Sequence, residues 1–388
     1  LVGTQEIIKL LNDPATAADQ LKNGAASDQI AVAKILQSYF YWRMTDAWGP
    51  IPYSDALKGK ENFRPVFDDQ QTVYNGIFAT LTEASSSLNT AASVDGDILL
   101  GGDLAHWKKF ANTIRLIAAM RLSQVDEAKA KSEFAAAISA GVLSSNDDNV
   151  VYKHLSDENN DNLWEDRFQT RLDQCVSEPL VNYMKSTGDP RLPIYADPAL
   201  ATGEYAGMPY GLTQDLAGNI PNNDVSFVGK AVRQKTSPTF VMTYSQVLFA
   251  MAEAAHRGWI SGGAAAAEQY YLDAIKASLQ QWGVYTEDGY KALVGQDAVK
   301  FDASKTMERI HQQKWVSLYL NGFEAWAEWR RTGYPVLTPP VQIIHPTKAI
   351  PLRHGYPTTE RDLNGDNYNA VVSKIGKDDI DVPVWWDK

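Results

Sequence analysis

Apolar residues recur every three or four positions over both ends of the chain. This spacing is the period of an α-helix, and it predicts helices rather than strands for these parts. Residues 29–48 are apolar on nearly every side, which is typical of a buried helix. Asp103 and Gly141 stand where helix caps are expected. The expected helices cover residues 29–48, 71–88, 102–123, 125–141, 240–259, 264–282, 303–321 and a short stretch between Gly322 and Gly333. We therefore expect a mainly α-helical protein.

The middle of the chain, residues 144–238, loses this regular spacing. Runs such as SSNDDN, DENNDN and TGDPRLP interrupt it with residues that favour turns. One helix is expected there, over residues 177–186. We interpret 144–238 as an irregular insertion in a helical scaffold made of residues 1–143 and 239–335. The Pro- and Gly-rich residues 336–388 are expected to form an irregular C-terminal segment.

A faint repeat connects two of the expected helix pairs. Residues 130–137 and 267–274 share the pattern A-x-x-x-aromatic-x-x-A, and a further alanine, Ala118 or Ala255, stands twelve residues before each first alanine. In tetratricopeptide units such small residues let two paired helices approach closely. The sequence therefore predicts tetratricopeptide-like helix pairs in an αα-superhelix, with the insertion between them.

Composition excludes several classes of protein. A formal charge of −11 repels nucleic-acid backbones, so no nucleic-acid partner is expected. Cys175 is the single cysteine and cannot form an internal disulfide. No apolar run of about 18 residues could cross a bilayer as a helix. Leu1 opens within a helical pattern rather than a signal peptide, so we expect the chain to begin inside the fold.

Motifs for catalysis and metal binding are missing from the sequence. It contains no HExxH, GxxxxGK[ST] or GxSxG, and its six histidines are scattered. The stretch DLNGDN at 362–367 imitates a calcium loop, but Asn367 and Ser373 stand where glycine and glutamate are required, so a polar turn is expected. We expect no cofactor, no metal ion and no catalytic residue.

Glu324 and Glu328 are the one pair of carboxylates that suggests an enzyme. They lie four residues apart, close enough for the acid pair of a retaining glycosidase. Arg330 and Arg331 lie within a turn of them, and this favours structural ion pairs. We therefore expect both glutamates to stabilise the fold.

Several blocks of the sequence, in order along the chain, resemble those of the SusD/RagB family. They are YFYWRMTDAWGPIPYSDAL (39–57), DGDILLGGDLAHWKKFANTIRLIAAMRLS (95–123), TGDPRLPIYADP (187–198), AEAAHRGW (252–259), FEAWAEWRRTGYP (323–335) and IPLRHGYPTTE (350–360). The resemblance implies one SusD-like domain over residues 1–388, built on four tetratricopeptide-like helix pairs. We expect the insertion to face the ligand.

The same resemblance implies a function. Members of the family are lipoproteins on the surface of Gram-negative outer membranes, and they capture a glycan, or sometimes a peptide, for a SusC-like TonB-dependent transporter. In the family a lipidated cysteine and a further segment precede the block that matches residues 1–48. We therefore expect the lipid anchor on a cysteine that precedes residue 1. A glycoside hydrolase and a protein-interaction scaffold remain alternatives.

Candidate ligand-binding residues lie mainly in the insertion. A sugar ring needs flat aromatic surfaces beside hydrogen-bonding groups. The candidates are Asn160, Asp161, Trp164, Arg167 and Phe168, then Tyr205 and Tyr210 among glycines, with Trp282 and Tyr285 as a second group. An equally good interpretation is that Trp164 and Phe168, four residues apart, anchor the insertion to the core.

Overall fold

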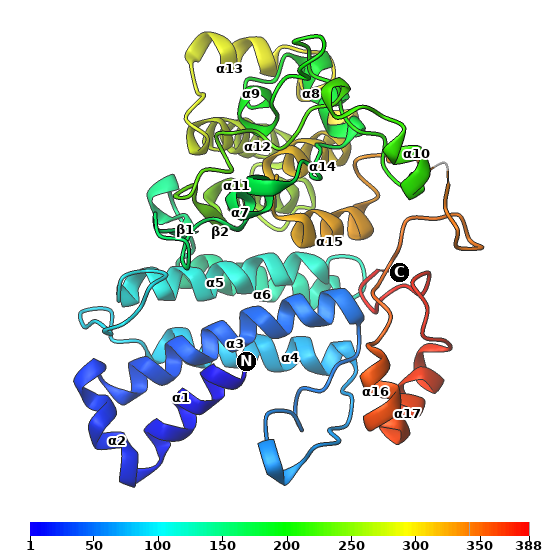
Figure 1. Ribbon diagram of the computed structural model, residues 1–388. Coiled ribbons are helices and arrows are strands. Elements are labelled where there is room, and N and C mark those ends of the chain that lie inside the picture. The colour runs from blue at the N-terminus through cyan, green and yellow to red at the C-terminus, as the bar shows by residue number, and fades with distance from the viewer. Residues whose placement is uncertain (341, 388) are drawn as a thin grey trace. The chain divides into compact units, whose positions relative to one another are not determined.

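The computed structural model describes residues 1–340 and 342–387, which fall into two compact units. Unit 1 contains residues 1–143 and the C-terminal part from residue 351 onward, and unit 2 contains the residues between them. Helices dominate both units (Figure 1), which confirms the predicted mainly α fold. No helix among the described residues is long and apolar enough to cross a membrane.

Unit 1 is a layer of consecutive helices that pack in the order of the chain. α3 contacts α4, α4 contacts α5, and α5 contacts α6, while α1 packs on α3. The helices are α1 (Val2–Asn12), α2 (Pro14–Gln20), α3 (Ala26–Trp48), α4 (Gln70–Ser87), α5 (Leu104–Arg121), α6 (Glu127–Ala140), α16 (Thr358–Leu363) and α17 (Gly365–Ile375). Asp103 caps α5 by accepting a hydrogen bond from His106 N, and Gly141 ends α6 with φ +93°, as the sequence predicts.

Unit 2 surrounds a helical core with shorter elements. Its long helices are α11 (Tyr244–His256), α12 (Gly263–Gln281), α14 (Thr306–Ser317) and α15 (Gly322–Thr332), and α11 packs on both α12 and α14. The shorter elements are β1 (Val150–Tyr152), α7 (Leu163–Thr170), α8 (Glu178–Thr187), α9 (Leu192–Tyr195), α10 (Gln214–Gly218), β2 (Thr239–Met242) and α13 (Glu287–Val294). β1 and β2 pair in an antiparallel ladder, with Val151 opposite Phe240.

Three expectations about local structure were wrong. The insertion contains α7, α8, α9 and α10, not one helix, because caps such as Asn162 start short helices between its turns. The helix expected at residue 240 begins at Tyr244, after strand β2, whose β-branched and aromatic residues suit a ladder. Residues 336–388 contain α16 and α17, since Tyr368, Val371 and Ile375 give α17 one apolar face.

The alanine repeat marks close helix packing in both units. Ala118 on α5 and Ala255 on α11 are at most 1% exposed, and the repeat residues on α6 and α12 are equally buried. α6 packs on α5, and α12 packs on α11, as the tetratricopeptide-like pattern predicts. Because these alanines are enclosed by protein, a larger side chain would have to displace its neighbours.

We expect Ala118→Leu to lower the free energy of unfolding by about 1–3 kcal/mol, because the extra carbons overpack the contact between α5 and α6. Chemical denaturation measures this change. Ala135→Leu is the matched control, since Ala135 lies on the exposed face of α6. Equal stabilities of the two variants would contradict close pairing of the helices.

Candidate functional site

The start of α7 is fixed to the rest of unit 2 by Asn162. Its buried side chain accepts a hydrogen bond from Trp164 N at 2.8 Å and donates one to Ser237 O at 2.7 Å. Its backbone N–H donates to Lys235 O at 2.8 Å. These bonds satisfy the N-terminus of the helix and set the direction of α7. The candidate residues on α7 therefore have defined positions.

Trp164 and Phe168 lie on the face of α7 that packs against an apolar cluster of unit 2. The cluster, here called the insertion core, consists of Val176, Leu180, Val181, Met184, Leu192, Tyr195, Ala196, Val228, Val232 and Val316. The Phe168 ring meets Phe227 edge-on at 6.2 Å, and the guanidinium of Arg233 lies 4.3 Å from its centre. Phe168 and Trp164 are thus both partly buried on this core, and Phe168 is additionally contacted by Phe227 and Arg233.

The polar candidates form the edge beside these rings. Arg167 and Asn160 are exposed, and the Asp161 side chain is only 2% exposed, 3.7 Å from Lys235 Nζ. Burial and the nearby carboxylates of Asp166 and Glu165 raise the pKa of Asp161. The exposed groups of this edge are therefore the Arg167 guanidinium and the Asn160 amide.

Two tyrosines of the insertion have different roles. Tyr205 is half-buried on the insertion core, and its carbonyl accepts a hydrogen bond from Lys185 Nζ at 2.8 Å. The Tyr210 hydroxyl donates to Thr338 O, and the neighbouring Gly211 lies against Pro340. Tyr205 therefore lies on the same core as Trp164, while Tyr210 is bound to the segment around residue 338.

Trp282 and Tyr285 lie in different clusters, although they are three residues apart. The Trp282 ring contacts the rings of Tyr195 and Phe240, each with ring centres 5.2 Å apart, and it packs on the insertion core. The Tyr285 hydroxyl donates to Glu287 at 2.6 Å, and its ring packs near Tyr290. The structure therefore brings together Trp164, Phe168, Tyr205 and Trp282, but does not place Tyr285 with them.

Sequence reasoning missed the support beneath this cluster. Tyr319 stacks on Tyr195 with ring centres 4.0 Å apart. Arg191, fully buried, binds Asp189 at 2.6 Å and donates to Ser278 and Gln313, each at 2.9 Å. The D-P-R-L block contained Asp189 and Arg191, but their partners on α12 and α14 are distant in sequence.

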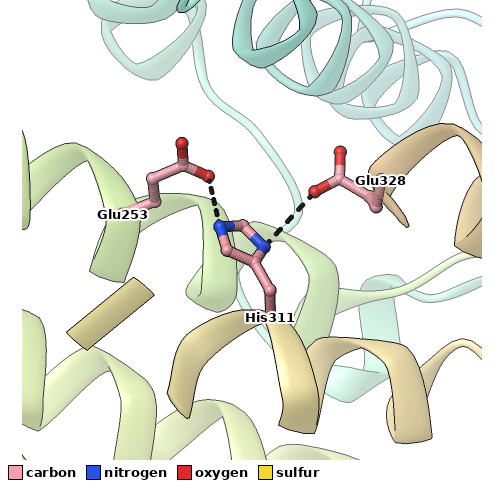
Figure 2. A group of neighbouring side chains, drawn as sticks. All are labelled: Glu253, His311 and Glu328. Atoms are coloured by element: carbon pink, nitrogen blue, oxygen red, sulfur yellow. Dashed lines mark ion pairs between the residues drawn. The ribbon is translucent and has the colours of Figure 1, made fainter. Parts of the chain in front are cut away.

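Glu328 of α15 belongs to a buried charge network. Figure 2 shows Glu253 of α11, His311 of α14 and Glu328 of α15 pointing toward one another. His311 Nε2 lies 3.2 Å from Glu253, and its Nδ1 lies 3.6 Å from Glu328. Arg331 binds Glu253 through both Nη atoms at 2.7 Å and Glu328 at 2.8 Å.

The charges in this network argue against metal binding and against a catalytic role for Glu328. Lys314 Nζ lies 2.8 Å from Glu328, so Arg331 and Lys314 balance the two carboxylates. Arg257 also binds Glu253 at 2.8 Å, so cations already hold both carboxylates and a divalent cation here would add further positive charge. The Glu328 side chain is also only 5% exposed, which keeps it from a substrate. The predicted ion pair of Glu328 is confirmed, and Glu324 is fully buried as well.

Burial determines the protonation of this network. Burial lowers the pKa of His311 to about 4, although Glu253 acts in the opposite direction. For Glu253 burial favours a higher pKa, but Arg331 and His311 outweigh it and hold that pKa well below its usual range. At neutral pH the network therefore contains a neutral imidazole and an ionised Glu253.

We expect unit 2 to lose stability as the pH falls from 7 to 5. The folded-state pKa of His311 lies below the unfolded value of about 6.5, so the unfolded chain takes up the proton first. The loss is about 2 kcal/mol at pH 5. Urea unfolding at both pH values should show it in the wild type, with a smaller loss in His311→Gln. His256→Gln, at an exposed histidine, is the control; an unreduced loss in His311→Gln would contradict this role.

Known proteins resemble this chain over nearly its whole length. Residues 4–357 match the SusD-like family, described as starch-binding associating with outer membrane. A solved chitin-binding protein is 34% identical at a TM-score of 0.86, covering 100% of this chain and 85% of that one. A SusD homologue from Bacteroides fragilis is 26% identical at a TM-score of 0.85, covering 100% and 88%. No curated protein matches the chain.

A further solved structure has a similar fold and is also named as chitin-binding. A chitin-binding SusD homologue from Flavobacterium johnsoniae is 29% identical at a TM-score of 0.82, covering 96% of this chain and 84% of that one. The family match, the solved relatives and the paired helices thus lead to one assignment. The chain belongs to the SusD-like family of nutrient-binding proteins associated with the outer membrane.

Proposed function

We propose that this chain captures a glycan at the cell surface and delivers it to a SusC-like TonB-dependent transporter without chemical change. Two solved relatives are named as chitin-binding, which supports an oligosaccharide of N-acetylglucosamine as the ligand. In this proposal a lipid on a cysteine N-terminal to the present sequence anchors the protein to the outer membrane.

The observation that carries the proposal is the partly exposed Trp164 beside a polar edge. The backbone of Trp164 is bound by the capping residue Asn162, and its ring packs on the insertion core. These two contacts restrict the motion of the ring. The exposed Arg167 and Asn160 lie near it in the chain and supply a guanidinium and an amide. A rigid ring loses little entropy when a sugar stacks on it, and the polar edge can bind the hydroxyl and acetamido groups.

We expect Trp164→Ala to weaken binding of chitin oligosaccharides at least about tenfold, because the stacking surface is lost. Isothermal titration calorimetry measures the change, after an array of glycans and peptides has identified the preferred oligosaccharide.

The control for this prediction is Trp259→Ala, which removes a half-buried tryptophan of unit 2 outside the insertion core. It should leave affinity unchanged. If Trp164→Ala lowers stability strongly and affinity stays the same, Trp164 is an anchor of the insertion and not a ligand-binding residue.

Binding without catalysis is supported by the partners of the buried carboxylates. Glu328 and Glu253 each hold a buried cation within 2.8 Å, which leaves neither free to protonate a glycosidic oxygen. A sensitive assay for cleavage of the bound oligosaccharide separates capture from hydrolysis. Cleavage products that depend on the folded chain would replace this proposal by a glycoside hydrolase.

We expect the helical scaffold to contact the transporter and the insertion to remain open to the ligand. Packed helices offer a broad and rigid docking surface, as a stable complex requires. Crosslinking and purification from native membranes should recover a TonB-dependent transporter with this protein. Consistent recovery of the protein alone would contradict the partnership.

A further inference from the structure

Unit 1 contains a cavity of about 490 Å³ that has no part in the function proposed above. Its wall comes from the turn after α3, the start of α4, α17 and the end of the chain. The apolar side chains in the wall include Trp48, Phe67, Val371, Ile375, Val384 and Trp385. Both the volume and the aromatic lining are within the range of pockets for small organic ligands.

Arg353 is the buried charged residue of this cavity. It lines the cavity and is 2% exposed. Its Nη1 lies 3.1 Å from Asp378 Oδ1, and its guanidinium lies 4.6 Å from the centre of the Tyr356 ring. Yet Nε, Nη1 and Nη2 have no hydrogen-bond acceptor among the described residues.

Asp378 compensates the charge of Arg353 without satisfying its donors. Its two oxygens accept hydrogen bonds from Tyr356 N at 3.1 and 3.2 Å, and Oδ2 also accepts one from the Tyr368 hydroxyl at 3.2 Å. Buried donors without an acceptor are costly, about 1–3 kcal/mol each. The planar guanidinium can bind both oxygens of a carboxylate at once, which would satisfy these donors.

The start of α4 adds a second positive element to the cavity. Asp69, Gln70 and Gln71 line it at the N-terminus of this 18-residue helix. The Asp69 carboxylate is engaged by Thr72 N at 2.7 Å, and the Gln70 side chain binds Thr45 O and Trp385 N. The helix dipole favours an anion at this end, and the exposed Lys374 lies at the same cavity.

We propose that this cavity binds a small organic carboxylate with a ring or aliphatic body. The carboxylate lies on Arg353, and the body packs between Trp48 and Trp385. An acidic sugar and the carboxyl end of a peptide both have this chemistry. The residues involved belong to unit 1, so this site is separate from the insertion surface of unit 2.

Two matched pairs of probes test the proposal and distinguish the sources. Glucuronate is compared with glucose, and N-acetyl-leucine with N-acetyl-leucinamide, by calorimetry and by the fluorescence of tryptophan. We expect at least one acid to bind about tenfold or more tighter than its uncharged partner. The acid with the higher affinity identifies the sugar or the peptide as the source.

Variants then locate the binding. Arg353→Gln should remove the preference for the acid, while Arg361→Gln, at an exposed arginine of the same unit, should keep it. Gln71→Trp narrows the cavity from an exposed position and should weaken binding of the acid at least about tenfold. This second variant keeps the test decisive if Arg353→Gln does not fold.

The proposal is overturned by any of three results. The first is an equal affinity for each acid and its uncharged partner. The second is that neither of them binds at millimolar concentration. Alternatively, the folded Arg353→Gln and Gln71→Trp proteins can both keep the wild-type affinity for the acid. None of these results bears on glycan capture by Trp164, which is measured with uncharged oligosaccharides.

Discussion

A buried carboxylate shared by several helices constrains the packing of each unit. In unit 1 Asp46 of α3 accepts hydrogen bonds from Arg121 of α5 at 3.2 Å and from Trp386 near the chain end at 2.9 Å. In unit 2 Glu253 of α11 binds both Nη atoms of Arg331 from α15. A buried charge is costly unless donors surround it, so these helices must keep their relative positions.

The same constraint gives the irregular insertion a rigid base. Turns and short helices bury too little surface to be fixed by packing alone. Asp189 and Arg191 connect α8 and α9 to Ser278 of α12 and Gln313 of α14 through bonds that are entirely buried. Asn162 makes the corresponding connection at the start of α7. The insertion thus depends on polar bonds to the scaffold, and these bonds keep its aromatic rings in place.

The sequence predicted features that depend on local spacing and missed those that depend on distant partners. The long helices follow from the apolar period, and the cap at Asp103 follows from its side chain. β2 was mistaken for the start of α11, because a four-residue apolar run fits either element until its partner β1 is known. For the candidate site, spacing placed Trp164 and Phe168 on one face of α7. It could not show that Phe227 and Arg233 contact the Phe168 ring, since both are more than fifty residues away in the sequence.

Residue type alone therefore does not decide whether a side chain of this protein binds a ligand or supports the fold. The partners of each side chain decide it. Trp282 and Trp164 pack on the same core and both are partly buried, but the rings of Tyr195 and Phe240 contact Trp282, whereas Trp164 lies in the first turn of α7. The arginines differ in the same way. Arg331 is held between two carboxylates, and Arg353 has a charge partner but no acceptor for its donors. Donors that the fold leaves unsatisfied beside a cavity are where a ligand gains most.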